Sequence, residues 1–142
     1  MSATLIKNAQ IVNEGHITNT DLRIVDQRIQ RIANNIVAQP GDHVIDAEGA
    51  YLLPGMIDDQ VHFREPGLTN KGTIASESRA AVAGGITSYM EMPNVNPATT
   101  SITALERKFD IAAQGSLANY SFYLGATEDN LEQIKLLDPS KH

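Results

Sequence analysis

The sequence contains no cysteine and no tryptophan, and it has no long apolar run. Without cysteine the chain cannot form a disulfide framework, a thiolate zinc site or a cysteine nucleophile, so a reducing cytoplasm is the expected location. No stretch reaches the roughly 18 apolar residues of a membrane span. Residues 1–10 also lack the apolar core of a signal peptide. We therefore expect a soluble, unexported protein.

Positive charge is scarce as well. The chain has 11 Lys and Arg against 17 Asp and Glu, which gives a formal net charge of −6. A negative surface repels the phosphates of nucleic acids and the headgroups of anionic lipids. We therefore expect neither a nucleic acid nor a membrane surface as a partner.

Residues 1–55 alternate short apolar runs with turn residues, which predicts a small all-β domain. An apolar–polar alternation flanks Asp26-Gln27 on both sides, a pattern typical of a hairpin of half-buried strands. The composition changes at Pro54-Gly55, where we place the domain boundary. Strands are predicted at residues 3–12, 21–25, 28–32, 43–46 and 51–53.

Residues 56–142 repeat a rhythm of strand, loop and helix, which predicts an α/β domain. Thr73 and Ser101 are candidate N-caps for the first two helices, and a third helix is predicted to open at Thr127. Three βα units in succession imply parallel strands joined by right-handed crossovers. The predicted strands are residues 56–63, 86–92 and 119–124, and the first two helices are residues 74–83 and 102–115.

Three parallel strands with no fourth leave a sheet edge open. An eight-unit α/β barrel takes about 250 residues, far more than residues 56–142 supply. We therefore expect this sequence to be incomplete, and the downstream remainder of the same protein to be its partner.

Polar residues recur at every second position of the first predicted βα strand and just beyond it. Because side chains alternate along a strand, these residues are predicted to share one face. Burying such a face costs several kcal/mol unless it meets a ligand, a metal or water. An edge strand with one wet face is the alternative, and His62 alone is more often an ordinary hydrogen-bonded histidine. The residues are Asp58, Gln60, His62 and Arg64.

Arg64 and Asn94 follow the first and second of the predicted parallel strands. Ligands of parallel α/β folds bind at the carboxyl ends of the strands. An arginine offers a two-pronged donor to a carboxylate, and an asparagine amide can donate to the same anion. The two residues therefore outline a pocket for an organic acid. Taken singly, Arg64 could be a surface charge and Asn94 a turn residue beside Pro93.

Four motifs stand out along the chain: Pro54-Gly55-Met56-Ile57-Asp58, His62-Phe63-Arg64-Glu65-Pro66-Gly67, Ala83-Gly84-Gly85-Ile86-Thr87 and Met92-Pro93-Asn94. With them the chain resembles the N-terminal third of the dihydroorotases, in the amidohydrolase superfamily. Allantoinases look similar in the histidine-containing motif but usually carry a leucine between the proline and asparagine of the last one. Hydantoinases lack the Arg-Glu-Pro-Gly run.

The resemblance implies a fold and an activity. The fold is the first three βα units of a TIM-type (β/α)8 barrel, preceded by strands of a small β-sandwich. The activity is the zinc-dependent interconversion of N-carbamoyl-L-aspartate and (S)-dihydroorotate in pyrimidine biosynthesis, in which metal-activated hydroxide attacks the ring amide. His62 matches a zinc ligand, whereas Arg64 and Asn94 match residues that hold the substrate carboxylate. A homodimer is also implied.

Gln60 departs from the family pattern, which usually reads His-x-His with both imidazoles facing the metals. A glutamine offers only a neutral carbonyl oxygen, a poor zinc ligand beside imidazole. The site could hold a single metal arranged differently, or the carbonyl or a water could fill the gap. Metal binding could also be lost, which would make the protein a non-catalytic structural or regulatory subunit. Another cyclic amidohydrolase, such as an allantoinase, is a further alternative.

The family's remaining metal ligands and its general base lie on later strands. The resemblance therefore assigns no catalytic residue to this sequence. We expect residues 1–142 alone to be inactive and the function to reside in the assembled enzyme.

Overall fold

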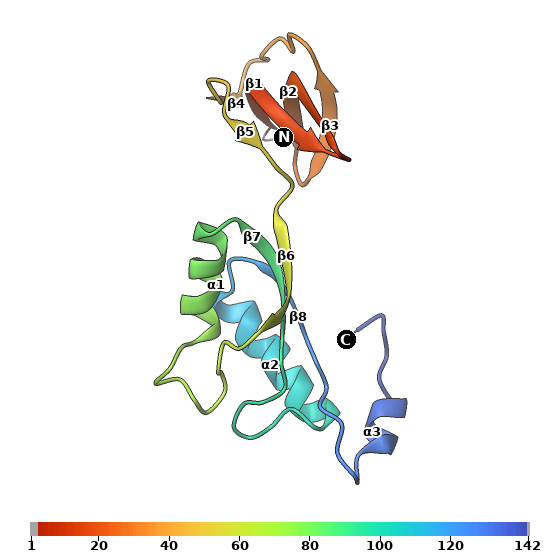
Figure 1. Cartoon of the computed structure of the whole chain (residues 1–142). Helices are drawn as coiled ribbons and strands as arrows, with labels where there is room; N and C mark the ends of the chain where they lie inside the picture. The colour runs from red at the N-terminus through yellow and green to blue at the C-terminus, as the bar shows by residue number, and fades with distance from the viewer. Residues whose placement is uncertain (1–2, 142) are drawn as a thin grey trace. The chain divides into compact units, whose positions relative to one another are not determined.

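The computed structural model describes residues 3–141, and Met1, Ser2 and His142 lie outside the described residues. The chain divides into two compact units, Met1–Pro54 and Gly55–His142. Each unit contains its own sheet (Figure 1). The division falls beside the change of composition at Pro54-Gly55.

The first unit is a five-stranded sheet in which β3, β2, β1 and β4 are neighbours in that order and β5 also pairs with β1. β1, β2 and β3 form an antiparallel meander, with the predicted hairpin turn at Asp26-Gln27. β4 and β5 run parallel to β1. The strands are β1 Ala3–Asn13, β2 His16–Val25, β3 Arg28–Ala33, β4 Asp42–Asp46 and β5 Tyr51–Leu52.

One face of this sheet carries an apolar groove of about 220 Å³. Ile29 and Ile32 remain 62% and 51% exposed there. Apolar residues gathered on one face suit a second packed layer. Within the described residues of this unit there is a single sheet, so the sandwich stays a prediction. The groove is lined mainly by Ile6, Ile11, Leu22, Ile24, Ile29, Ile32, Leu52 and Leu53.

The second unit confirms the predicted alternation of strands and helices. β6, β7 and β8 pair in that order, and both pairings are parallel. α1 contacts β7 and α2, and α2 contacts β8 (Figure 1). The α/β class predicted from the sequence is therefore correct. The elements are β6 Met56–Val61, α1 Ile74–Ala83, β7 Ile86–Glu91, α2 Ile102–Gly115, β8 Asn119–Phe122 and α3 Leu131–Lys135.

The first two helices begin directly after the N-cap residues that the sequence predicts. Thr73 Oγ1 accepts a hydrogen bond of 3.0 Å from the Ser76 amide, and Ser101 Oγ accepts one of 3.2 Å from the Ala104 amide. Both residues are the predicted N-caps, because each side-chain oxygen satisfies an amide that has no partner inside the helix.

The third helix does not begin at Thr127, as the sequence analysis predicted, but at Leu131. The side chain of Asn130 explains the difference. Its Oδ1 accepts from the Thr127 amide at 2.8 Å, and its Nδ2 donates to the carbonyls of Thr100 and Gly125 at 2.8 and 2.7 Å. These bonds hold residues 125–130 as a loop, so the helix starts only after them.

The core of the second unit lies between its sheet and its helices. Tyr89 of β7 is 1% exposed, and its ring centroid lies 4.5 Å from that of Phe63, just beyond β6. Phe109 of α2 meets Phe122 of β8 edge to face, with 5.0 Å between centroids. Such ring pairs add to the stabilisation that burial provides. The core therefore anchors the ends of the parallel strands.

None of the helices within residues 3–141 is long and apolar enough to span a lipid bilayer.

Candidate functional site

His62 and Asn94 meet at the carboxyl ends of β6 and β7. Val61 and Phe63 are buried, whereas His62 between them is exposed, as alternation along an extended chain requires. His62 Nδ1 lies 2.9 Å from Asn94 Oδ1. An amide oxygen only accepts, so Nδ1 is the donor in this contact and Nε2 is not engaged by Asn94. Two of the predicted site residues are thus brought together.

Arg64 lies one residue beyond Phe63, where the strand conformation ends. Its φ of 72° is in the left-handed region, which is uncommon for a residue with a side chain. Its amide donates a hydrogen bond of 3.0 Å to Glu91 Oε1 at the end of β7. The residue is partly buried, and its guanidinium makes no hydrogen bond or ion pair to any of residues 3–141. It therefore remains available to an anion.

The loops that carry Arg64 and Asn94 pack against each other. The Asn96 amide donates to the Pro66 carbonyl at 3.1 Å. Gly67 has a φ of 83°, and a Cβ placed on it would lie 1.8 Å from the carbonyl oxygen of Asn96. Only glycine tolerates both the backbone conformation and the close approach. Arg64 and Asn94 are therefore held on adjoining loops.

Gln60 is exposed, and its backbone amide donates to Asp58 Oδ1 at 3.1 Å. No group of three or more His, Cys, Asp or Glu within residues 3–141 could hold a metal. A catalytic zinc normally takes three protein ligands. The described residues offer the imidazole of His62 and fall short of that number, so they do not form a zinc site by themselves.

Glu65 belongs to the same motif as His62 and Arg64 but serves the fold. Its Oε2 accepts a hydrogen bond of 2.8 Å from the amide of Ile74, the first residue of α1. A carboxylate at a helix N-terminus is favoured by both the free amides and the helix dipole. Glu65 therefore fixes the loop after β6 to the helix that follows.

A buried ion pair beneath these loops was missed by the sequence analysis. Lys108 Nζ lies 2.9 Å from Glu91 Oε2, and both side chains are fully buried. Burial raises the pKa of Glu91 and lowers that of Lys108, against the opposing influence of their mutual attraction. A signal was present, because Lys108 lies on the apolar face of α2, between Leu105 and Ala112.

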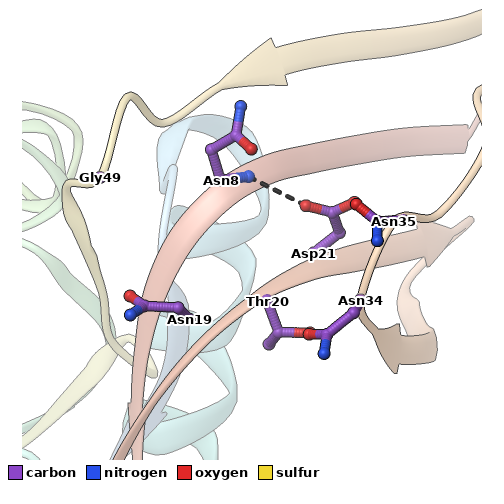
Figure 2. Close-up of a pocket in the computed structure, with 7 residues that line it drawn as sticks. All are labelled: Asn8, Asn19, Thr20, Asp21, Asn34, Asn35 and Gly49. Carbon is purple, nitrogen blue, oxygen red and sulfur yellow. Dashed lines mark hydrogen bonds between the residues drawn. The ribbon is translucent and has the colours of Figure 1, made fainter.

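The first unit has a polar pocket of about 390 Å³, shown in Figure 2. The pocket contains one carboxylate, that of Asp21, and both of its oxygens are hydrogen-bonded to the backbone. Oδ1 accepts from the Asn8 amide and Oδ2 from the Ile36 amide, both at 2.9 Å. The first bond stabilises the irregular stretch of β1 around Asn8, whose φ is 56°, and the second holds the segment after β3. The pocket therefore has a structural explanation. It is lined by Asn8, Asn19, Thr20, Asp21, Asn34, Asn35 and Gly49.

Comparison with known proteins decides the family. The model of the dihydro-orotase-like family matches residues 49–131. The chain belongs to this family. The resemblance found in the motifs is therefore confirmed.

The curated relatives of this dihydro-orotase-like chain differ in their activities. It is 36% identical over 133 residues to an allantoinase of Desulfitobacterium hafniense strain Y51, covering 92% of this chain and 29% of that protein. It is 37% identical over 132 residues to a dihydroorotase of Methanosarcina acetivorans, covering 93% of this chain and 28% of that protein. The chain thus spans under a third of the length of these relatives.

A solved structure supports the same membership. An L-hydantoinase from Arthrobacter aurescens matches with a TM-score of 0.87 and 31% sequence identity. The match covers 93% of this chain and 30% of that one. Relatives in sequence and structure are therefore named as enzymes that open cyclic amides.

Proposed function

We propose that the protein carrying this chain is a cyclic amide hydrolase that interconverts dihydroorotate and N-carbamoyl-L-aspartate in pyrimidine biosynthesis. The observation that carries the proposal is that Arg64 and Asn94 lie on adjoining loops, which are joined by the hydrogen bond from the Asn96 amide to the Pro66 carbonyl. The guanidinium of Arg64 and Nδ2 of Asn94 donate to none of residues 3–141. Together they suit the carboxylate of such a substrate, since a guanidinium binds a carboxylate through two parallel hydrogen bonds.

We propose further that β6, β7 and β8 are the first strands of an eight-unit barrel, whose ligands bind at the carboxyl ends of the strands. His62 would be the zinc ligand contributed by this chain, through its Nε2 atom. The remaining ligands and the general base would come from the rest of the protein, which we expect to form a homodimer.

Two other functions are each favoured by one observation. The identity of 36% to an allantoinase favours that activity, whereas the asparagine directly after Pro93 favours dihydroorotase. Gln60, which stands where the family usually has a histidine, favours a non-catalytic member of the family.

The test is hydrolysis of dihydroorotate, allantoin and hydantoin by the complete purified protein supplied with zinc. We expect dihydroorotate to be the preferred substrate, by at least about tenfold in kcat/KM. A preference for allantoin would establish an allantoinase. If the protein hydrolyses none of the three substrates and retains no zinc after dialysis, it is a non-catalytic member of the family.

A matched variant asks whether Arg64 holds the substrate. Arg64→Lys keeps the positive charge but removes the planar, two-pronged donor. We expect KM for dihydroorotate to rise about tenfold or more, with a smaller change in kcat. An unchanged KM would remove Arg64 from the carboxylate pocket.

A further inference from the structure

The Glu91–Lys108 ion pair reaches both loops of the proposed carboxylate pocket. Glu91 closes β7 and Lys108 lies in α2, and neither side chain has any exposed surface. Lys108 Nζ also lies 4.8 Å from the centre of the Phe122 ring. The ammonium is thus enclosed by a carboxylate and an aromatic face, which leaves it little freedom to move.

Glu91 holds the loop of Arg64. Its Oε1 accepts the Arg64 amide at 3.0 Å, while its Oε2 faces Lys108. Left-handed backbone at a residue other than glycine persists only when its surroundings fix it. The Arg64 carbonyl accepts from the Leu68 amide at 3.0 Å within the loop, and the carboxylate of Glu91 is the partner from outside the loop that holds the Arg64 amide.

Lys108 holds the loop of Asn94. Its Nζ donates to the carbonyl of Met92 at 3.1 Å, two residues before Asn94. The Met92 amide in turn donates to the Val61 carbonyl at 3.0 Å, beside His62. One buried pair is thus bonded to the backbone on both sides of the pocket.

Stabilisation of the fold does not by itself explain why an ion pair is buried here. Removing two charges from water is costly, and replacing a buried ion pair with apolar residues of similar volume often leaves stability unchanged or improves it. What apolar residues cannot reproduce here is the acceptor for the Arg64 amide and the donor to the Met92 carbonyl.

We infer that Glu91 and Lys108 are positioning residues, which hold Arg64 and Asn94 at the spacing that a substrate carboxylate requires. The inference rests on the proposed function. Both side chains are fully buried, so they act through the two loops and do not touch the substrate themselves.

The test compares two double variants in the complete protein. Glu91→Leu/Lys108→Met removes the charges and every bond to the loops. Glu91→Gln/Lys108→Met removes the charges too, but the glutamine oxygen can still accept the Arg64 amide. The two differ mainly in that one acceptor, so differences between them report on the loop of Arg64.

Two quantities are measured, KM and kcat for dihydroorotate, and hydrogen exchange of the backbone at residues 62–66 and 92–97. With leucine at position 91 we expect KM to be about tenfold higher or more than with glutamine, with a smaller change in kcat. Hydrogen exchange at residues 62–66 should also be about tenfold faster or more with leucine at position 91 than with glutamine. Exchange at residues 92–97 should rise in both variants, because both lose the lysine.

Equal KM and equal exchange at residues 62–66 in two folded double variants would overturn the inference. If the leucine variant does not fold, the glutamine variant decides: exchange should rise at residues 92–97 and stay slow at residues 62–66, and the opposite pattern would overturn the inference. If the parent protein does not hydrolyse dihydroorotate, the proposed function fails, while exchange still reports whether the pair holds the loops.

Tyr89→Phe is the matched control. Tyr89 lies on the same strand, is 1% exposed and shares a hydrogen bond of 3.1 Å with Ser116 Oγ. Loss of this hydrogen bond should lower the free energy of unfolding without changing KM or hydrogen exchange at the two loops. A rise in KM equal to that of the leucine variant would show that any damage to the core disturbs the pocket.

Discussion

His62 and Asn94 come from the ends of neighbouring parallel strands and share a hydrogen bond of 2.9 Å between Nδ1 and Oδ1. This bond turns the amide nitrogen of Asn94 away from the imidazole. The residue proposed to bind metal and the residue proposed to bind the carboxylate therefore orient each other.

Asn94→Ala should weaken the binding of substrates that carry a carboxylate. A hydrogen bond to a charged group contributes roughly 1.5–3 kcal/mol, so KM for dihydroorotate should rise by about tenfold to a hundredfold. Steady-state kinetics measure this. Asn119→Ala, an exposed asparagine at the start of β8, is the control and should leave KM unchanged. Equal effects from the two variants would contradict the proposed role of Asn94.

Gly67→Ala should disturb the contact between the two site loops. The added methyl would meet the Asn96 carbonyl, and the left-handed backbone is itself unfavourable for alanine. We expect a loss of about 2 kcal/mol or more in the free energy of unfolding, together with a higher KM. Gly85→Ala shares a positive φ, 87°, but meets no atom within 4 Å. It should cost about 1 kcal/mol and leave KM unchanged.

Gln60→His should strengthen zinc binding if His62 is a ligand. A second imidazole restores the spacing of two residues that places both side chains on one face of the strand. Zinc affinity, measured by titration against a competing chelator, should rise by about tenfold or more. Gln30→His adds an exposed histidine to β3 and controls for unspecific binding. Equal affinity in the two variants would argue against metal at His62.

Acid should destabilise the first unit through Asp42. A hydrogen bond from the Gln39 amide and the adjacent Arg23 guanidinium lower the pKa of Asp42 from its usual value. As the pH falls, the carboxylate of Asp42 is therefore protonated in the unfolded chain before it is protonated in the folded protein. The stabilisation is present above about pH 4 and is lost as pH falls through the lowered pKa. Thermal unfolding between pH 6 and 3 checks this.

Asp42→Asn should be less stable than the parent at pH 6 and should lose less stability on acidification. Asp110→Asn, an exposed residue of α2, should follow the parent curve. Parallel curves for the parent and Asp42→Asn would show that another carboxylate governs acid unfolding.

Local chemistry made much of the second unit predictable. The N-caps Thr73 and Ser101 and the alternation of strands with helices are short-range features, and the structure has them where the sequence predicts. The parallel order follows from connections too long for hairpins. In the first unit, β2 begins at His16, before the predicted Asp21. Residues 16–20 are polar and exposed for the most part, so they carry no alternation signal.

Long-range contacts account for what the sequence did not predict. The start of α3 depends on Asn130, whose partners include a carbonyl 30 residues away. The Glu91–Lys108 pair joins residues 17 positions apart, and an isolated lysine is usually assigned to the surface. In the site, His62 and Asn94 share a hydrogen bond that the sequence did not predict, and the left-handed turn at Arg64 ends the shared face predicted for the four polar residues.

The backbone conformation of Arg64 bears on how its chemistry can be altered by engineering. Alanine at this position would delete the guanidinium and also penalise the backbone, so a loss of activity would conflate two causes. Glycine and asparagine accept a positive φ more readily and would remove the charge while keeping the chain's path. Redesign for a neutral ring substrate should therefore start from those two residues.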